Sequence, residues 1–154
     1  MLLKTINEHA SLKTKALILT AFITGARQGE IAALEEKHID FIDRAITFNQ
    51  RITKGADGNY KRADGLKSDI SKTIPVPDSY LDVIRNFMLI NKKARIALGV
   101  DPNHKYIFGS PEGKFELPTS LYRNWMRFAK KHNLREIRFH DLRHTSASYF
   151  AKQP

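Results

Sequence analysis

The chain has no cysteine among its 154 residues, so neither a disulfide framework nor a thiolate metal site can form. No apolar run approaches the roughly 18 residues that a membrane-spanning helix needs. The first five residues lack the apolar stretch and small-residue cleavage site of a signal peptide. Together these absences argue against disulfide-rich secreted scaffolds and membrane-spanning proteins, and they predict an intracellular one.

Acidic residues are scarce relative to basic ones. Lys and Arg number 26 against 16 Asp and Glu, which gives a formal net charge of +10. A surplus of this kind suits a phosphate-binding surface, because each neutralised phosphate releases condensed counterions. A basic charge that only keeps the protein soluble explains the composition equally well. Charge alone therefore leaves both interpretations open, and the motifs must decide between them.

The hydrophobic fraction of 42% indicates one globular domain rather than a disordered chain. Residues 12–23 are apolar on nearly every face, which predicts a central buried helix that Gly25 can end in a left-handed cap. A second helix should begin at or near Arg27. Further helices are expected after Pro77, from Pro118, and from about His140 onward.

Between these helices the apolar period changes to two. Residues 39–48 alternate around Asp43 and Arg44, as in a hairpin, and residues 72–76 predict an edge strand. Residues 53–70 are polar and rich in glycine and lysine, so we expect them to be mobile and to lie outside the core. The sequence thus predicts an α+β fold, mostly helical, with a small antiparallel three-stranded sheet on one side.

The segment His140-Asp141-Leu142-Arg143-His144 could carry chemistry, because its spacing places His140, Arg143 and His144 on one helical face. One function that fits is a zinc site of the His-x-x-x-His kind, although Arg143 would bring positive charge to a cation site. Another is anion recognition, in which Arg143 offers a planar fork of donors and His140 one donor more. A solvated basic helix is the third interpretation.

A second arginine lies more than a hundred residues earlier, in Gly25-Ala26-Arg27-Gln28-Gly29-Glu30. The start of a helix supplies free N–H groups and a positive dipole end that suit phosphate. Arg27 adds a charged donor there, and Glu30 could hold its guanidinium in place. A routine surface ion pair of little energetic value is the alternative.

Three segments resemble the tyrosine recombinase (phage integrase) family. Residues 24–31 are similar to its first arginine box, and residues 140–148 are similar to its second, with the His-x-x-Arg core. Residues 67–75 resemble the segment that bears the catalytic lysine. The resemblance implies that Arg27 and Arg143 clamp the scissile phosphate, that His140 assists, and that Lys67 protonates the leaving 5′ oxygen. Glu30 and His144 would support these residues, with no metal and no cofactor.

The resemblance further implies site-specific DNA recombination or integration in a bacterial or phage-infected cytoplasm. Strand cleavage and rejoining would pass through a 3′-phosphotyrosine, within a homotetramer on double-stranded DNA. Residues 1–154 would form a catalytic-domain fragment without the core-binding domain and the nucleophilic tyrosine, and so would be inactive alone. Tyr149 lies too close to Arg143 to be that nucleophile. The alternatives are a type IB topoisomerase and a DNA-binding module whose catalytic boxes have decayed.

Overall fold

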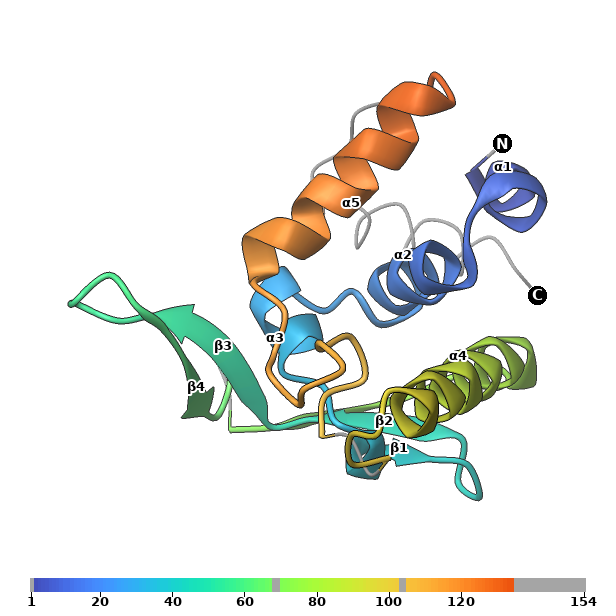
Figure 1. Ribbon diagram of the computed structural model, residues 1–154. Coiled ribbons are helices and arrows are strands. Elements are labelled where there is room, and N and C mark those ends of the chain that lie inside the picture. Colours follow the sequence, from blue (N-terminus) through green and yellow to red (C-terminus); the bar gives the residue numbers. More distant parts are fainter. Residues whose placement is uncertain (1, 68–69, 103–104, 135–154) are drawn as a thin grey trace.

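The computed structural model describes residues 2–67, 70–102 and 105–134 (Figure 1). It has a mixed α+β fold, as predicted, with helices gathered on one side and antiparallel strands on the other. The elements are α1 (Leu2–His9), α2 (Leu12–Thr24), α3 (Gln28–Ala32), the 3₁₀ turn η1 (Glu36–His38), β1 (Ile39–Asp40), β2 (Ala45–Phe48), β3 (Gln50–Lys54), β4 (Tyr60–Asp64), β5 (Lys72–Pro75), α4 (Asp78–Ala97) and α5 (Pro118–Lys131).

Helix α2 is the centre of the helical layer, as its nearly all-round apolar sequence predicts. Ser11 caps its first turn by accepting a hydrogen bond from the Thr14 N–H at 3.2 Å, and Gly25 ends it in a left-handed conformation with φ 66°. The helix packs against α4 and α5, and α5 also covers α3. Four apolar residues of α5 are buried in this core: Leu121, Trp125, Phe128 and Ala129.

The predicted hairpin and edge strand form one antiparallel sheet in the order β1-β2-β5. Ile46 faces Ile39 on one side and Ile74 on the other, so the register places apolar residues together. β5 is the edge strand, and its Pro75 lies where a missing N–H does not interrupt a central ladder. The three-stranded sheet is confirmed.

A second antiparallel ladder, β3–β4, was not predicted. It pairs residues 50–54 with residues 60–64 and projects away from the rest of the molecule in Figure 1. Its outer strand has no buried residue, so the sequence there shows none of the apolar alternation by which strands are recognised. The polar stretch does lie outside the core, as expected, but it contains regular structure. Among the described residues, no helix is both long and apolar enough to cross a membrane.

Candidate functional site

The junction between α2 and α3 fixes the backbone position of Arg27. The Gly25 N–H donates to the Ala21 carbonyl at 3.0 Å, and the Ala26 N–H donates to Thr24 Oγ1 at 3.1 Å. Ala26 is itself buried. Arg27 then adopts the extended conformation of an N-cap residue, with φ −76° and ψ 156°, directly before the first turn of α3. The predicted position of Arg27 at the start of the second helix is confirmed.

The Arg27 side chain is exposed although its backbone is tightly held. Its guanidinium forms no hydrogen bond and no ion pair with any other residue that the structure describes. An arginine with free donors above a rigid backbone is already arranged to receive an anion, since its planar fork matches two oxygens at once. The site therefore offers a donor group on a fixed backbone, and the partner of that group must come from a ligand or from another part of the protein.

Glu30 contacts the backbone of Arg27 and does not hold its guanidinium, as we had expected it to. Its side chain is only 6% exposed, and its Oε1 accepts a hydrogen bond from the Arg27 backbone N–H at 3.2 Å. The same oxygen lies 3.5 Å from the Nζ atom of Lys72 on β5. A buried carboxylate gains more from a backbone donor and a fixed ammonium than from an exposed, solvated guanidinium. Glu30 thus orients the backbone of Arg27 and leaves its side chain free.

Gly29 allows the hairpin to dock against α3. A Cβ atom at this position would lie 2.7 Å from the carbonyl oxygen of Ile52, which is closer than real Cβ contacts come. Ile52 is a buried residue of β3. Only glycine permits the strand backbone to approach the helix this closely. The projecting hairpin is therefore placed next to the turn of helix that carries Arg27.

Gln50 anchors the base of the hairpin, a role that was not predicted. Its Nε2 donates to the Ala33 carbonyl and to Glu35 Oε2, both at 2.6 Å. Its Oε1 accepts a hydrogen bond from Arg62 on β4 at 3.0 Å. Gln50 is buried, so these bonds satisfy an amide that would otherwise be costly to bury. The role of this buried glutamine is apparent only from the fold, because its partners are distant in the sequence.

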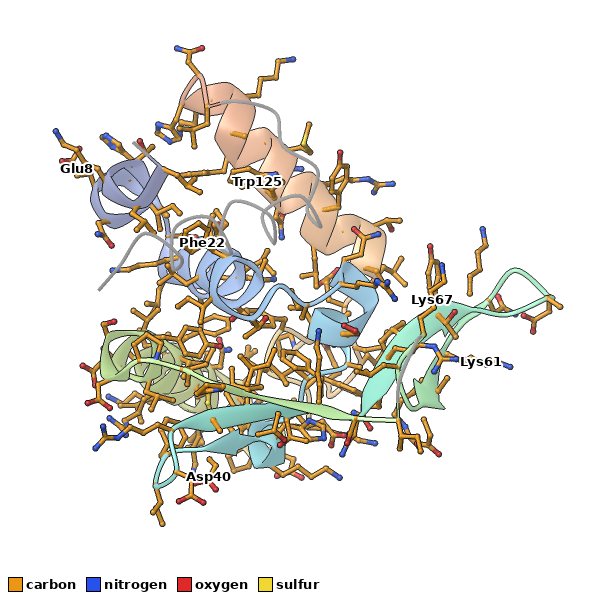
Figure 2. The ribbon with its side chains drawn as sticks, turned by 180° about the vertical axis from the view of Figure 1, so that it is seen from behind. Glu8, Phe22, Asp40, Lys61, Lys67 and Trp125 are labelled. Carbon is orange, nitrogen blue, oxygen red and sulfur yellow. The ribbon has the colours of Figure 1, made fainter. Side chains whose placement is uncertain are left out.

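The hairpin region carries basic side chains, and Figure 2 shows two of them, Lys61 on β4 and Lys67 after it. Lys67 is exposed and follows Gly65, whose N–H donates to the Asn49 carbonyl at 2.8 Å. Arg51 also fixes the chain at the end of β4, because its Nη1 donates to the carbonyls of residues 64 and 65 at 2.8 Å each. The proposed lysine therefore sits just beyond an anchored end of the hairpin.

Helix α5 adds a second basic surface. Its sequence, PTSLYRNWMRFAKK, contains no acidic residue, and the exposed residues include Arg123, Arg127, Lys130 and Lys131. The buried face of α5 packs against α2 and α3, so its charged face points to solvent. A helix with several cations and no carboxylate is suited to a polyanion.

The predicted segment with His140, Arg143 and His144 lies outside the described residues. Its convergence with Arg27 and Lys67 therefore stays a prediction. The zinc alternative rests on the same histidines. Within residues 2–67, 70–102 and 105–134, no group of three or more metal-ligating side chains is close enough to hold an ion.

Comparison with known proteins identifies the family. Residues 1–153 match the phage integrase family. The chain belongs to this family. A relative in Caldanaerobacter subterraneus, described as XerC-like tyrosine recombinase, is 26% identical, and the match covers 88% of this chain and 38% of the relative. This member of the phage integrase family thus spans well under half the length of that relative.

Solved structures share the fold. The Tn1549 transposon integrase, solved in complex with transposon right end DNA, superposes with a TM-score of 0.75 at 18% identity, over 99% of this chain and 51% of that one. The XerA recombinase gives a TM-score of 0.69 at 17% identity, over 97% of this chain and 46% of that one. The catalytic core of lambda integrase gives 0.60 at 17% identity, over 97% and 77%.

Proposed function

We propose that the protein containing this chain performs site-specific DNA recombination, cleaving and rejoining strands through a 3′-phosphotyrosine. The observation that carries the proposal is Arg27. Its backbone is fixed by hydrogen bonds at the junction of α2 and α3, while its guanidinium remains exposed and unpaired among the described residues. Family membership supports the same reaction class.

In the proposed reaction, a tyrosine oxygen attacks the scissile phosphorus and the bond from phosphorus to the 5′ oxygen breaks. Arg27 and Arg143 bind the non-bridging oxygens, where negative charge accumulates in the five-coordinate transition state. His140 assists by hydrogen bonding or proton transfer, and His144, four residues later in the sequence, supports it. Lys67 gives its proton to the departing 5′ oxygen. The exposed position of Lys67 beyond β4 leaves its ammonium accessible to such a group.

Positioning explains why a rigid backbone matters for this chemistry. Cations that are already in place at the transition state need no reorganisation when the charge develops. Glu30 supports this arrangement, because it fixes the N-cap of α3 without neutralising the guanidinium. A surface arginine on a mobile loop would have to be ordered during the reaction.

The proposed partner is double-stranded DNA, bound by a homotetramer of the intact protein. The net charge of +10 and the acid-free face of α5 support DNA binding. One structural relative, the XerH recombinase, was solved bound to its palindromic difH substrate. We further propose that residues 1–154 form part of a catalytic domain, and that the intact protein also has a core-binding domain and a tyrosine nucleophile beyond Arg143.

The test is to trap the covalent intermediate. The intact protein and the 154-residue chain are each incubated with nicked DNA carrying the junctions of the element that encodes them. The intact protein should form a denaturation-resistant adduct on a tyrosine downstream of Arg143, and the chain alone should form none. An adduct on Tyr149, or none with the intact protein, would contradict the proposal. Relaxation of supercoiled DNA that lacks these junctions would favour the topoisomerase alternative.

For the chain alone we expect weak, salt-sensitive binding with little sequence preference. The logarithm of the binding constant should fall by about 0.9 per phosphate contacted for each unit of log salt concentration.

A further inference from the structure

Two lysines near the site differ sharply in their surroundings. Lys67 is exposed beyond β4, whereas the side chain of Lys72 is only 30% exposed. The Nζ atom of Lys72 lies 3.5 Å from Glu30 Oε1 and 5.6 Å from the centre of the Phe48 ring. Lys72 is thus held between a buried carboxylate and an aromatic face, which leaves it little freedom to reach a substrate.

Strand pairing fixes the backbone from which Lys72 extends. Lys72 is the register partner of Phe48 in the ladder between β2 and β5, and Phe48 is 1% exposed. The neighbouring pair, Thr47 and Thr73, shares a side-chain hydrogen bond of 2.9 Å. A cation over an aromatic ring gains a favourable interaction that strengthens as water is excluded. The ammonium is therefore positioned by the sheet and not by Glu30 alone.

Glu30 connects Lys72 to Arg27. Its buried oxygen accepts the Arg27 N–H at 3.2 Å and faces the Lys72 ammonium, and no other described cation pairs with it. A carboxylate that loses its cation while remaining buried must find water or move. If it moved, the N-cap of α3 would lose its acceptor and the Arg27 backbone would lose its constraint.

We infer that Lys72 is a positioning residue, which acts through Glu30 to fix the backbone of Arg27, and that it is not the acid that protonates the leaving group. This inference rests on the proposed function. The two lysines would have different roles: the exposed Lys67 protonates the leaving oxygen, and Lys72 helps to position Arg27. Substitution of either lysine should slow cleavage, but for different reasons.

The first test needs no DNA. In the 154-residue chain, Lys72→Met should raise the hydrogen-exchange rate of the Arg27 amide by about tenfold or more, because its acceptor is released. Lys13→Met is the matched control, since Lys13 is part of another lysine–glutamate pair, with Glu116 at 4.0 Å. It should leave the Arg27 amide unchanged. Equal exchange in the wild-type chain and Lys72→Met would overturn the inference, whatever the protein does to DNA.

The second test separates positioning from proton donation in the intact protein. Lys72→Met should slow single-turnover cleavage by about 10- to 100-fold, the scale on which misplacement of a reacting group acts. A substrate with a 5′ sulfur leaving group, which needs no proton, should rescue Lys67→Ala but not Lys72→Met. Rescue of Lys72→Met would make Lys72 the acid and overturn the inference.

A double variant completes the design. Glu30→Gln keeps an oxygen that can accept the Arg27 N–H but carries no charge that needs a cation. In that background, Lys72→Met should change the cleavage rate by less than about twofold, because effects that pass through one shared partner do not add. A full additional loss would show that Lys72 acts independently of Glu30. If the wild-type protein cleaves no DNA at all, the proposed function fails while the amide-exchange test still stands.

Discussion

Strands β2 and β4 are similar in length, but the chain supports them in opposite ways. β2 pairs on both sides and buries Ile46 and Phe48 at 0% and 1% exposure. Among the strands that the structure describes, β4 pairs only with β3, and it buries no residue. The first ladder is stabilised by apolar burial, whereas the second depends on a few contacts at its base, including Gln50 and the close approach of Ile52 to Gly29. The β1-β2-β5 sheet therefore contributes to stability, whereas the β3–β4 ladder mainly displays charged side chains.

The comparison predicts unequal responses to truncation. Ile46→Ala in β2 should lower the free energy of unfolding by about 2–5 kcal/mol, because it leaves a cavity in the core. Lys61→Ala in β4 should change it by no more than about 0.5 kcal/mol, because Lys61 is exposed. Urea unfolding of both variants measures the difference. Similar losses would show that the hairpin contributes to the core as much as the sheet does.

The second prediction concerns a change that should impair function but leave stability unchanged. In the intact protein, Arg27→Ala should lower the cleavage rate by at least on the order of 10²-fold, the scale for losing one preorganised transition-state donor. The melting temperature should stay close to that of the wild type, because the guanidinium is exposed and unpaired within the described residues. Arg27→Lys keeps the charge but not the two-pronged geometry, and it should restore only part of the rate. Unimpaired cleavage by Arg27→Ala would remove Arg27 from the site.

The third prediction tests how the hairpin is attached. Gly29→Ala should lower the free energy of unfolding by about 1–3 kcal/mol, since the new methyl group would meet the Ile52 carbonyl at 2.7 Å. The helix propensity gained with alanine, up to about 1 kcal/mol, offsets only part of this loss. Gln28→Ala, one residue earlier in α3, is the control and should be near neutral. A stabilised Gly29→Ala protein would mean that β3 can shift away from α3 without penalty.

The smallest expected effect is a pH dependence on the sheet side. Burial lowers the pKa of His38 below its ordinary value of 6.5, although Glu35 opposes the shift. The folded state then binds a proton less readily than the unfolded state, so stability is complete above pH 6.5. It declines as the pH falls through that value toward the lowered pKa. Protonation would also remove the acceptor for the Glu35 N–H, now 3.0 Å from Nδ1.

Urea midpoints measured at pH 7.5 and 5.5 check this prediction. The decline should be smaller in His38→Asn, because asparagine at position 38 does not titrate in this range. An unchanged decline in the variant would assign the pH dependence to other histidines.

Local pattern alone was enough to predict much of this chain. Three of the predicted features depend only on neighbouring residues: the apolar run of α2, its termination at Gly25, and the alternation in residues 39–48. Such signals are readable because helices and strands repeat their burial every 3.6 or two positions. Arg27 could be predicted as a site residue for a related reason, because residues 24–31 resemble a known motif. The position of His140, Arg143 and His144 relative to Arg27 is still a prediction.

Only the tertiary structure revealed what surrounds Arg27. The β3–β4 ladder escaped prediction because its outer strand buries nothing and shows no apolar period. Glu30 was assigned to the guanidinium of Arg27, but it serves the backbone N–H and Lys72, which lies 42 positions further along the chain. Gln50 gave no signal because its partners are distant in the sequence: Ala33 just after α3, Glu35 just before η1, and Arg62 on β4. The sequence determined which residues carry charge, whereas long-range packing decided which charges are neutralised and which remain available.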